Sequence, residues 1–190
     1  VDGNGAEEIV LAANAVGGPG RLWVVRRVRG SVFEGFQDHC LPGPTRTIAE
    51  PQRRDVAAVD FERKGRLDLL ASNADRLLLL RSESDGTLEP PVDMGPGALA
   101  AAQDLNGDRR TDVVTSVGES LLVRLCREDG TLAPGVPCPG RRMLGIADFD
   151  GDGTPDLLVR TADDSVRILP NDGAGAFRDS IAVRPGLRSW

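Results

Sequence analysis

The stretch Asp148-Phe-Asp-Gly-Asp-Gly-Thr-Pro-Asp156 decides the fold of this 190-residue chain, because it recurs at a fixed period. A step of 44 residues towards the N-terminus reaches Asp104-Leu-Asn-Gly-Asp-Arg-Arg-Thr-Asp112, which keeps nearly every polar position. Another step of 44 residues reaches a more divergent copy, Asp60-Phe-Glu-Arg-Lys-Gly-Arg-Leu-Asp68. The N-terminus, Val1-Asp-Gly-Asn-Gly-Ala-Glu-Glu8, is a fourth copy without the first acidic position. A period of roughly 20–50 residues indicates a repeat architecture.

Further landmarks keep the same register along the chain. Gly86-Thr-Leu, Gly130-Thr-Leu and Gly175-Ala-Phe each follow an acidic stretch by 18 or 19 residues. A Pro-Gly pair closes each unit, at Pro42-Gly43, Pro96-Gly97, Pro139-Gly140 and Pro185-Gly186. We therefore divide the chain into approximate repeats 1–54, 55–97, 98–140 and 141–186, within one domain spanning residues 1–190. Only the first connection carries a long polar insert, which we expect to be a surface loop.

Short apolar runs surround each acidic stretch. The runs expected before it are 56–59, 98–102 and 143–147; those after it are 9–13, 69–72, 113–117 and 157–161; and a third set covers 21–26, 77–81, 121–126 and 165–169. Runs of four to six apolar residues between Gly, Asp and Pro favour strands over helices. With a fourth strand after the next turn, the sequence predicts an all-β protein of four four-stranded antiparallel repeats, which are β-propeller blades.

The composition excludes several classes of partner. Aromatic residues are 4% of the chain and Tyr is absent, which argues against an aromatic platform for sugars or bases. The net charge of −6 argues against nucleic acid as a partner. No segment has the ~20 consecutive apolar residues of a membrane span, and no signal peptide is visible. We expect a chain that neither binds nucleic acid nor inserts into a membrane.

The acidic stretch has the chemistry of a calcium loop. Carboxylates at positions 1, 3, 5 and 9 of a tight turn, with the carbonyl of position 7, supply the oxygen ligands that calcium prefers. Glycine at position 4, Gly107 or Gly151, permits the turn. The predicted ligands are Asp148, Asp150, Asp152, Thr154 and Asp156 in one loop, and Asp104, Asn106, Asp108, Arg110 and Asp112 in the other. The alternative is an ordinary polar turn, which two matching copies at a fixed period disfavour.

The other two copies depart from this pattern. Lys64 stands at position 5, and we expect its ammonium to replace the cation and to pair with Asp60, Glu62 and Asp68. The N-terminal copy offers Asp2, Asn4 and Glu8 but lacks position 1, so it is at best a weakened site. We expect about two calcium ions in all.

Three cysteines are present, Cys40, Cys126 and Cys138, and none has the spacing of a zinc site. Cys126 and Cys138 flank a predicted hairpin and could form a disulfide, if the geometry allows it. Cys40 would then be left over.

These residues resemble the integrin-α-like FG-GAP or VCBS repeats. The resemblance rests on Ala147-Asp-Phe-Asp-Gly-Asp-Gly-Thr-Pro-Asp-Leu-Leu-Val159 and Val166-Arg-Ile-Leu-Pro-Asn-Asp-Gly-Ala-Gly-Ala-Phe177, and it extends to all four units. It implies a β-propeller whose calcium lies between the first two strands of a blade, on the same ligands as above. Members of this family serve in cell adhesion, as lectins and as accessory domains of secreted enzymes.

Four units are fewer than this family usually has. The chain either closes as a four-bladed ring or forms part of a larger propeller, completed by another chain. In that case Trp190 would lie in the interface.

The leading functional hypothesis is a calcium-binding scaffold that presents loops to a protein partner. The alternatives are a glycan-binding, lectin-like module and a non-catalytic accessory domain of a secreted enzyme. We do not expect an enzyme, because His39 and Cys40 are adjacent on a predicted strand and so point to opposite faces. Calcium sites with few carboxylates suit the millimolar calcium found outside the cytosol. The expected location is therefore extracellular, at the cell surface or periplasmic.

Overall fold

A computed structural model gives the three-dimensional structure of the protein. It describes the backbone of residues 8–14, 20–29 and 32–41, and of 56–61, 63–73, 76–177 and 180–183. Side chains are described in the second group, apart from Asn73.

The described chain forms four antiparallel sheets, each with its strands in sequence order. A three-stranded sheet contains β1 (Glu8–Asn14), β2 (Gly20–Arg29) and β3 (Val32–Leu41). The next contains β4 (Val56–Val59), β5 (Asp68–Asn73), β6 (Arg76–Leu80) and β7 (Val92–Pro96). The third contains β8 (Ala98–Gln103), β9 (Asp112–Val117), β10 (Ser120–Arg124) and β11 (Val136–Cys138). The last contains β12 (Arg142–Ala147), β13 (Asp156–Arg160), β14 (Val166–Leu169) and β15 (Ile181–Ala182).

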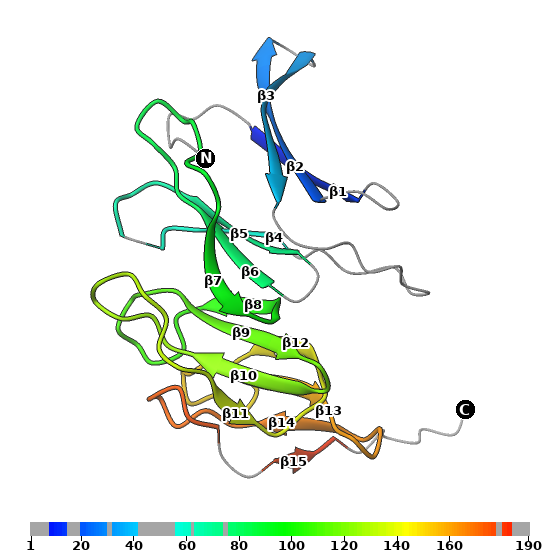
Figure 1. Cartoon of the computed structure of the whole chain (residues 1–190). Coiled ribbons are helices and arrows are strands. Elements are labelled where there is room, and N and C mark those ends of the chain that lie inside the picture. Colours follow the sequence, from blue (N-terminus) through cyan, green and yellow to red (C-terminus); the bar gives the residue numbers. More distant parts are fainter. Residues whose placement is uncertain are drawn as a thin grey trace.

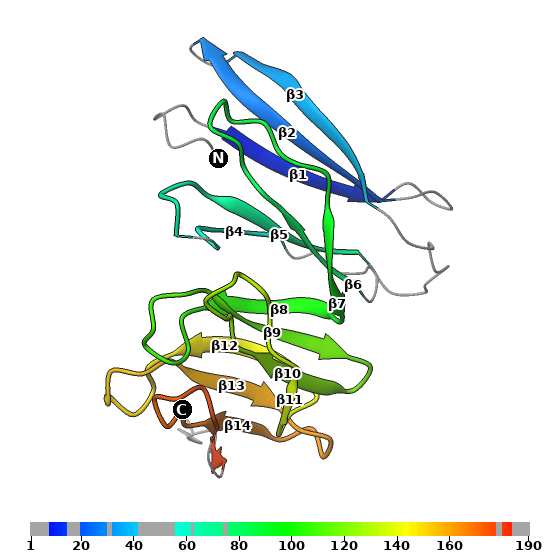
Figure 2. The ribbon, with the colours of Figure 1, turned by 60° about the vertical axis from the view of Figure 1, so that its left-hand side comes forward.

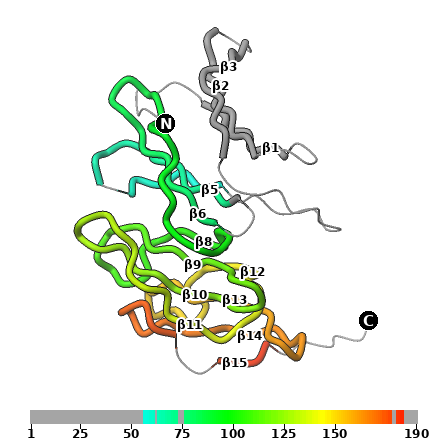
Figure 3. The backbone as a smooth tube through the Cα atoms, viewed as in Figure 1, coloured from blue at the N-terminus to red at the C-terminus, as the bar shows by residue number. Residues whose placement is uncertain are grey.

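The three four-stranded sheets follow one another in chain order. Figure 1 shows the chain passing from the last strand of one sheet into the first strand of the next, at β7–β8 and at β11–β12. The turned view of Figure 2 and the tube of Figure 3 show the same succession from green to orange. This arrangement is that of consecutive propeller blades, and no sheet closes on itself. The described part of the chain contains no helix of the length and hydropathy needed to cross a membrane.

Apolar side chains fill the space between successive sheets. One core lies between the sheets β4–β7 and β8–β11 and includes Leu70, Leu79 and Val113. A second core lies between β8–β11 and β12–β15 and includes Val114, Val123 and Leu157. Val113 and Val114 are neighbours on β9 and enter different cores, because alternate side chains of a strand point to opposite faces. The middle sheet is therefore buried on both faces.

The repeat also appears in the backbone irregularities. The β8–β9 register shifts between Leu99 and Ala101, and the β12–β13 register shifts between Met143 and Gly145, at equivalent places in the two units. Gly97 has a φ of 111°, and a Cβ there would lie 2.8 Å from the Thr115 Cβ. The Pro-Gly pair that closes this unit therefore marks a turn that only glycine fits.

The second residue of each acidic loop has a distinct place. Phe61 and Leu105 are each 1% exposed, and they belong to the cores formed with the following sheet. Phe149 has the same position in the last sheet and is 42% exposed. The second residue of the loop is therefore buried by the next sheet in both cases where the structure describes a following sheet.

The predicted strands are confirmed throughout the described residues. Each predicted run lies on a strand, with end positions that differ by at most three residues. The landmark residues Leu88, Leu132 and Phe177 form isolated bridges with Ser82, Cys126 and Asn171, which explains why they recur in register.

The predicted disulfide is wrong. Cys126 and Cys138 are both free thiols. Cys138 pairs with Leu121 across β10–β11, whereas Cys126 bridges to Leu132. Cys126 lies in the first core and Cys138 packs against the second, so the middle sheet separates them. The hairpin register carries the two cysteines away from each other, which their spacing in the sequence does not reveal. Cys40 lies on β3, outside the residues whose side chains are described.

Candidate metal-binding loops

In each of the three four-stranded sheets an acidic stretch joins the first and second strands. The loops run from β4 to β5, from β8 to β9 and from β12 to β13. Position 9 of each loop (Asp68, Asp112 or Asp156) is the first residue of the second strand. This sharp reversal places the acidic side chains at one end of each sheet.

The loop between β12 and β13 gathers three carboxylates. Asp148, Asp150 and Asp156 each offer an oxygen, and these atoms all lie within 4.8 Å of one another. Calcium binds oxygen at about 2.3–2.6 Å, so ligands on opposite sides of the ion lie roughly 5 Å apart. Three hard oxygen donors with this spacing fit calcium.

Backbone hydrogen bonds hold this loop in its turn. The amides of Gly151 and Gly153 donate to the two carboxylate oxygens of Asp148, at 2.7 and 3.0 Å. Both glycines have positive φ values, 82° and 90°, which glycine adopts without strain. The amide of Asp152 donates to Asp150 Oδ1 at 3.2 Å. The loop is thus already folded around the place where its carboxylates meet.

The predicted ligands Asp152 and Thr154 lie beside this cluster and bond to each other. Asp152 Oδ1 accepts the Thr154 amide at 2.8 Å and the Thr154 hydroxyl at 2.6 Å. The grouped carboxylates are those of positions 1, 3 and 9, and position 5 is not among them.

Asp156 also has a structural role. It is fully buried, and it accepts the amides of Phe149 and Asn171, each at 2.9 Å. Asp112 repeats the pattern with the amides of Leu105 and Cys126, at 2.9 and 2.7 Å. Asp68 likewise accepts the Ser82 amide at 2.8 Å. Position 9 therefore ties the acidic loop to the end of the third strand.

Sequence reasoning assigned position 9 to metal binding and missed this second role. A signal was present, because position 9 is acidic in all four copies, including the one with a lysine at position 5.

The loop between β8 and β9 has the same backbone and a different set of side chains. Asp104 accepts the amides of Gly107 and Arg109, at 2.8 and 2.7 Å. Asn106 donates its side-chain amide to Asp108 Oδ2 at 2.9 Å. Arg110 Nη2 lies 2.8 Å from the same oxygen. The predicted ligand set is present in order, and its position-5 carboxylate is paired with an arginine.

The pKa values of two carboxyl groups of this loop, Asp108 and Asp112, are shifted in opposite directions. Burial raises the pKa of Asp112, and the nearby charges of Asp108 and Asp104 add to the effect, against the hydrogen bonds from Cys126 and Leu105. Burial also acts on Asp108, but hydrogen bonds from the Arg110 amide and Asn106, with the charge of Arg110, lower its pKa overall. A bound cation would favour the charged form of both groups.

The lysine-containing loop differs in its hydrogen bonds. The amides of Lys64 and Gly65 donate to Asp60 Oδ1 and Oδ2, each at 2.8 Å. In this loop the amides of positions 5 and 6 donate to the carboxylate of position 1, whereas in the other two described loops the amides of positions 4 and 6 do so. Glu62 lies outside the described residues, so the expected pairing of the Lys64 ammonium stays a prediction.

The N-terminal copy falls largely outside the structure. Asp2 and Asn4 are not among the described residues, and Glu8 is described only as the first backbone position of β1.

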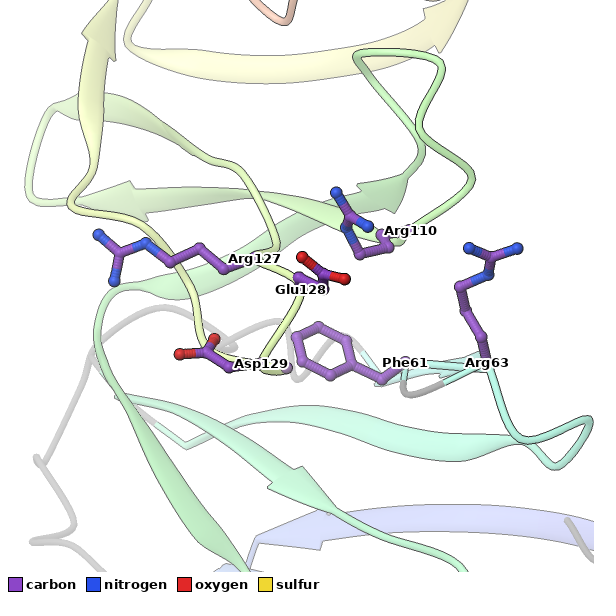
Figure 4. A pocket seen from close by; sticks show the side chains of 7 residues that line it. Phe61, Arg63, Arg110, Arg127, Glu128 and Asp129 are labelled. Atoms are coloured by element: carbon purple, nitrogen blue, oxygen red, sulfur yellow. The ribbon is translucent and has the colours of Figure 1, made fainter.

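A pocket of about 310 Å³ lies beside the loops of the second and third sheets. The loop before β5 provides Phe61 and Arg63, the loop before β9 provides Arg110, and the turn after β10 provides Arg127, Glu128 and Asp129 (Figure 4). Figure 4 shows the Glu128 carboxylate between the Arg127 and Arg110 side chains. The pocket is polar and carries charges of both signs.

Successive antiparallel sheets with an acidic loop between their first two strands define a β-propeller-like repeat protein. Within this class, residues 148–190 match the model of the FG-GAP-like repeat. The last unit is therefore an FG-GAP-like repeat, which confirms the resemblance seen in the sequence. No curated protein matches the chain in sequence.

Two solved structures are similar in fold. One is a lectin of Agrocybe aegerita, described as recognising non-reducing terminal N-acetylglucosamine, with a TM-score of 0.59 and 18% identity. The match covers 94% of this chain and 53% of the lectin, so the chain spans about half the length of the lectin. The other is the Tc holotoxin pore of Photorhabdus luminescens, with a TM-score of 0.50 and 19% identity, over 90% of this chain and 9% of that one. At these identities the likeness concerns the fold alone.

Proposed function

We propose that the protein is a calcium-binding β-propeller scaffold that presents its loops to a protein partner. The observation that carries this proposal is the cluster of Asp148, Asp150 and Asp156, whose oxygens lie within 4.8 Å of one another in a preformed loop. Asp104, Asn106, Asp108 and Asp112 provide a second site, on a loop with the same backbone hydrogen bonds. In the loop between β12 and β13 the ion would neutralise carboxylates that the fold brings together.

The proposed role of calcium is structural. It would fix the loop between the first two strands, which Asp156 already ties to the end of the third strand. Stiff loops on a rigid array of sheets are suited to binding, because little conformational freedom is lost on contact. Our proposal includes no catalytic role, and it places the protein outside the cytosol, where calcium is abundant enough for such sites.

A glycan-binding module is the second candidate. It is supported by the likeness to the Agrocybe aegerita lectin, which covers 94% of this chain. Sugar recognition usually relies on aromatic faces, and Trp23 and Trp190 are the largest aromatic residues of the sequence. If glycan binding survives Trp23→Ala and Trp190→Ala together, an aromatic sugar site is excluded.

Calcium titration by calorimetry, with thermal melts, tests the leading proposal. We expect about two binding events, and a melting temperature that falls when calcium is chelated. At a concentration 100-fold above the dissociation constant, each site adds about 2.7 kcal/mol to the free energy of unfolding. Magnesium at the same concentration is the control, since it demands stricter octahedral geometry. An unchanged melting temperature on chelation would contradict a structural calcium.

A further inference from the structure

Position 7 makes equivalent contacts in the two candidate loops. The Thr154 amide donates to Asp152 Oδ1, and the Arg110 amide donates to Asp108 Oδ1, both at 2.8 Å. Each side chain also reaches the backbone carbonyl that follows the third strand. Thr154 Oγ1 lies 3.5 Å from the Asn171 oxygen, and Arg110 Nε lies 3.2 Å from the Cys126 oxygen. The two residues therefore fill the same structural place.

The two residues differ in charge. Thr154 donates a hydrogen bond from its neutral hydroxyl to Asp152, the position-5 carboxylate, at 2.6 Å. Arg110 gives it a guanidinium, with Nη2 at 2.8 Å from Asp108 Oδ2. The two side chains of this ion pair are 27% and 22% exposed, so solvent screens them only in part. Asn106 donates to the same oxygen, and with the Arg110 amide on Oδ1 the Asp108 carboxylate already accepts three donors.

We propose that Arg110 is an internal competitor of calcium for Asp108, and that it sets the affinity of the loop between β8 and β9. This inference rests on the proposed function. Calcium and the guanidinium both need the Asp108 carboxylate, so binding of the ion requires the ion pair to break. At the same place in the loop between β12 and β13 stands the neutral Thr154.

The surroundings provide room for the displaced side chain. Arg110 lines the 310 Å³ pocket together with Glu128 and Asp129. Glu128 lies beside Arg110 in Figure 4, and the ion pair of the loop joins Arg110 to Asp108 rather than to Glu128. A guanidinium released from Asp108 would therefore meet another carboxylate within the same pocket, which lowers the cost of its displacement.

The test replaces Arg110 with the residue found at position 7 of the other loop. Arg110→Thr is compared with Arg109→Asn, which removes the same charge from an exposed neighbour and suits its positive φ of 66°. Both changes are made in an Asp150→Ala background, so that calorimetry reports the loop between β8 and β9. Thermal melts in chelator verify that each variant folds.

We expect Arg110→Thr to bind calcium about 3- to 10-fold more tightly than the background, as loss of a partly exposed ion pair implies. Arg109→Asn should change the affinity less than about 2-fold, because asparagine tolerates the positive φ and the change removes only screened, long-range charge. Equal shifts in the two variants would overturn the proposal, and so would the absence of any gain while calcium still binds the loop between β8 and β9 in the background variant. If calcium binds neither loop in the unsubstituted protein, the proposed function itself fails.

Discussion

Asp156 and Asp150 both face the candidate calcium site, yet they have different surroundings. Asp156 is fully buried and accepts two backbone amides, whereas Asp150 is exposed and accepts one. Removal of a buried acceptor leaves its donors without a partner, and this costs about 1–3 kcal/mol for each group. The two carboxylates should therefore be separable by experiment.

We expect Asp156→Ala to abolish calcium binding to this loop and to lower the free energy of unfolding by about 2–4 kcal/mol even in chelator. Asp150→Ala should weaken calcium binding and leave the stability in chelator nearly unchanged. Urea denaturation with and without calcium measures both effects. Equal stability of the two variants in chelator would mean that the hydrogen bonds of Asp156 contribute little.

The reactivity of the two described thiols, Cys126 and Cys138, also depends on their surroundings. Burial raises the pKa of Cys126 and of Cys138 to about 11 in each case. The thiolate is the reactive form, so both should be inert at neutral pH in the folded protein. Each buried thiol has a higher pKa in the folded protein than in the unfolded chain. The free energy of unfolding should therefore fall as the pH rises from about 9 to 11, because the unfolded chain loses these protons first.

We expect iodoacetamide at pH 8 to modify Cys126 and Cys138 far more slowly in the native protein than in urea. Peptide mass mapping follows each cysteine separately and keeps Cys40 out of the measurement. Rapid native labelling of Cys126 would contradict its placement in the first core.

At the scale of the element, one side chain connects neighbouring sheets. Asn171 is 1% exposed and donates to the carbonyls of Leu105 and Pro155, at 2.8 and 3.1 Å. Its oxygen accepts the amides of Gly173 and Gly175. Because Leu105 belongs to the loop before β9, this residue links the two candidate calcium loops across the second core.

We expect Asn171→Ala to lower the free energy of unfolding by about 2–4 kcal/mol, since it leaves four buried or partly buried backbone groups without this partner. Asp172→Ala is the control, because Asp172 is an exposed neighbour that accepts the amides of Ala174 and Ala176 within its own turn. Denaturant unfolding of both variants in chelator is the measurement. A similar loss in the two variants would show that the link between sheets is unimportant.

The elements themselves could be predicted because each depends on local pattern. The run Leu77–Leu80 has no polar residue, and it is a strand buried on both faces. The residues of each loop could be predicted for the same reason, because their spacing in the sequence decides which of them share a tight turn. The cysteine geometry could not be predicted, because it depends on the register of β10 and β11 and on which core each residue enters.

Two features of the site also lay beyond the sequence. The double role of Asp156 needs knowledge of which amides end beside it after folding. The pairing of Arg110 with Asp108 depends on a side-chain conformation, because an arginine at this position could equally extend into solvent. Both features are tertiary contacts. The repeat pattern does not reveal them, because it assigns the same role to equivalent residues of different loops.

At the scale of the whole molecule, the sheets are not equally supported. The sheet β8–β11 has a core on each face, whereas β12–β15 has one described core, and Ile181 of β15 is 52% exposed. In repeat arrays the stability of a unit is roughly its own term plus those of its interfaces. The last sheet should therefore open more easily than the middle one.

Native-state hydrogen exchange tests this difference. We expect the amides of β9 and β10 to exchange most slowly and those of β14 and β15 to exchange through local opening. Calcium should slow exchange in β13 and the loop before it. Uniform exchange across the three sheets would indicate a single cooperative unit.

The exposure of Phe149 has a consequence for how such units assemble. The contact between sheets is heterologous, since one face of each sheet meets the opposite face of the next. A head-to-tail contact regenerates the same uncovered face with every unit added, so growth ends only by ring closure or by a cap of different surface. Phe61 and Leu105 are buried where a following sheet packs against them. Phe149 is 42% exposed, and it distinguishes the open face of the last described sheet from its packed face.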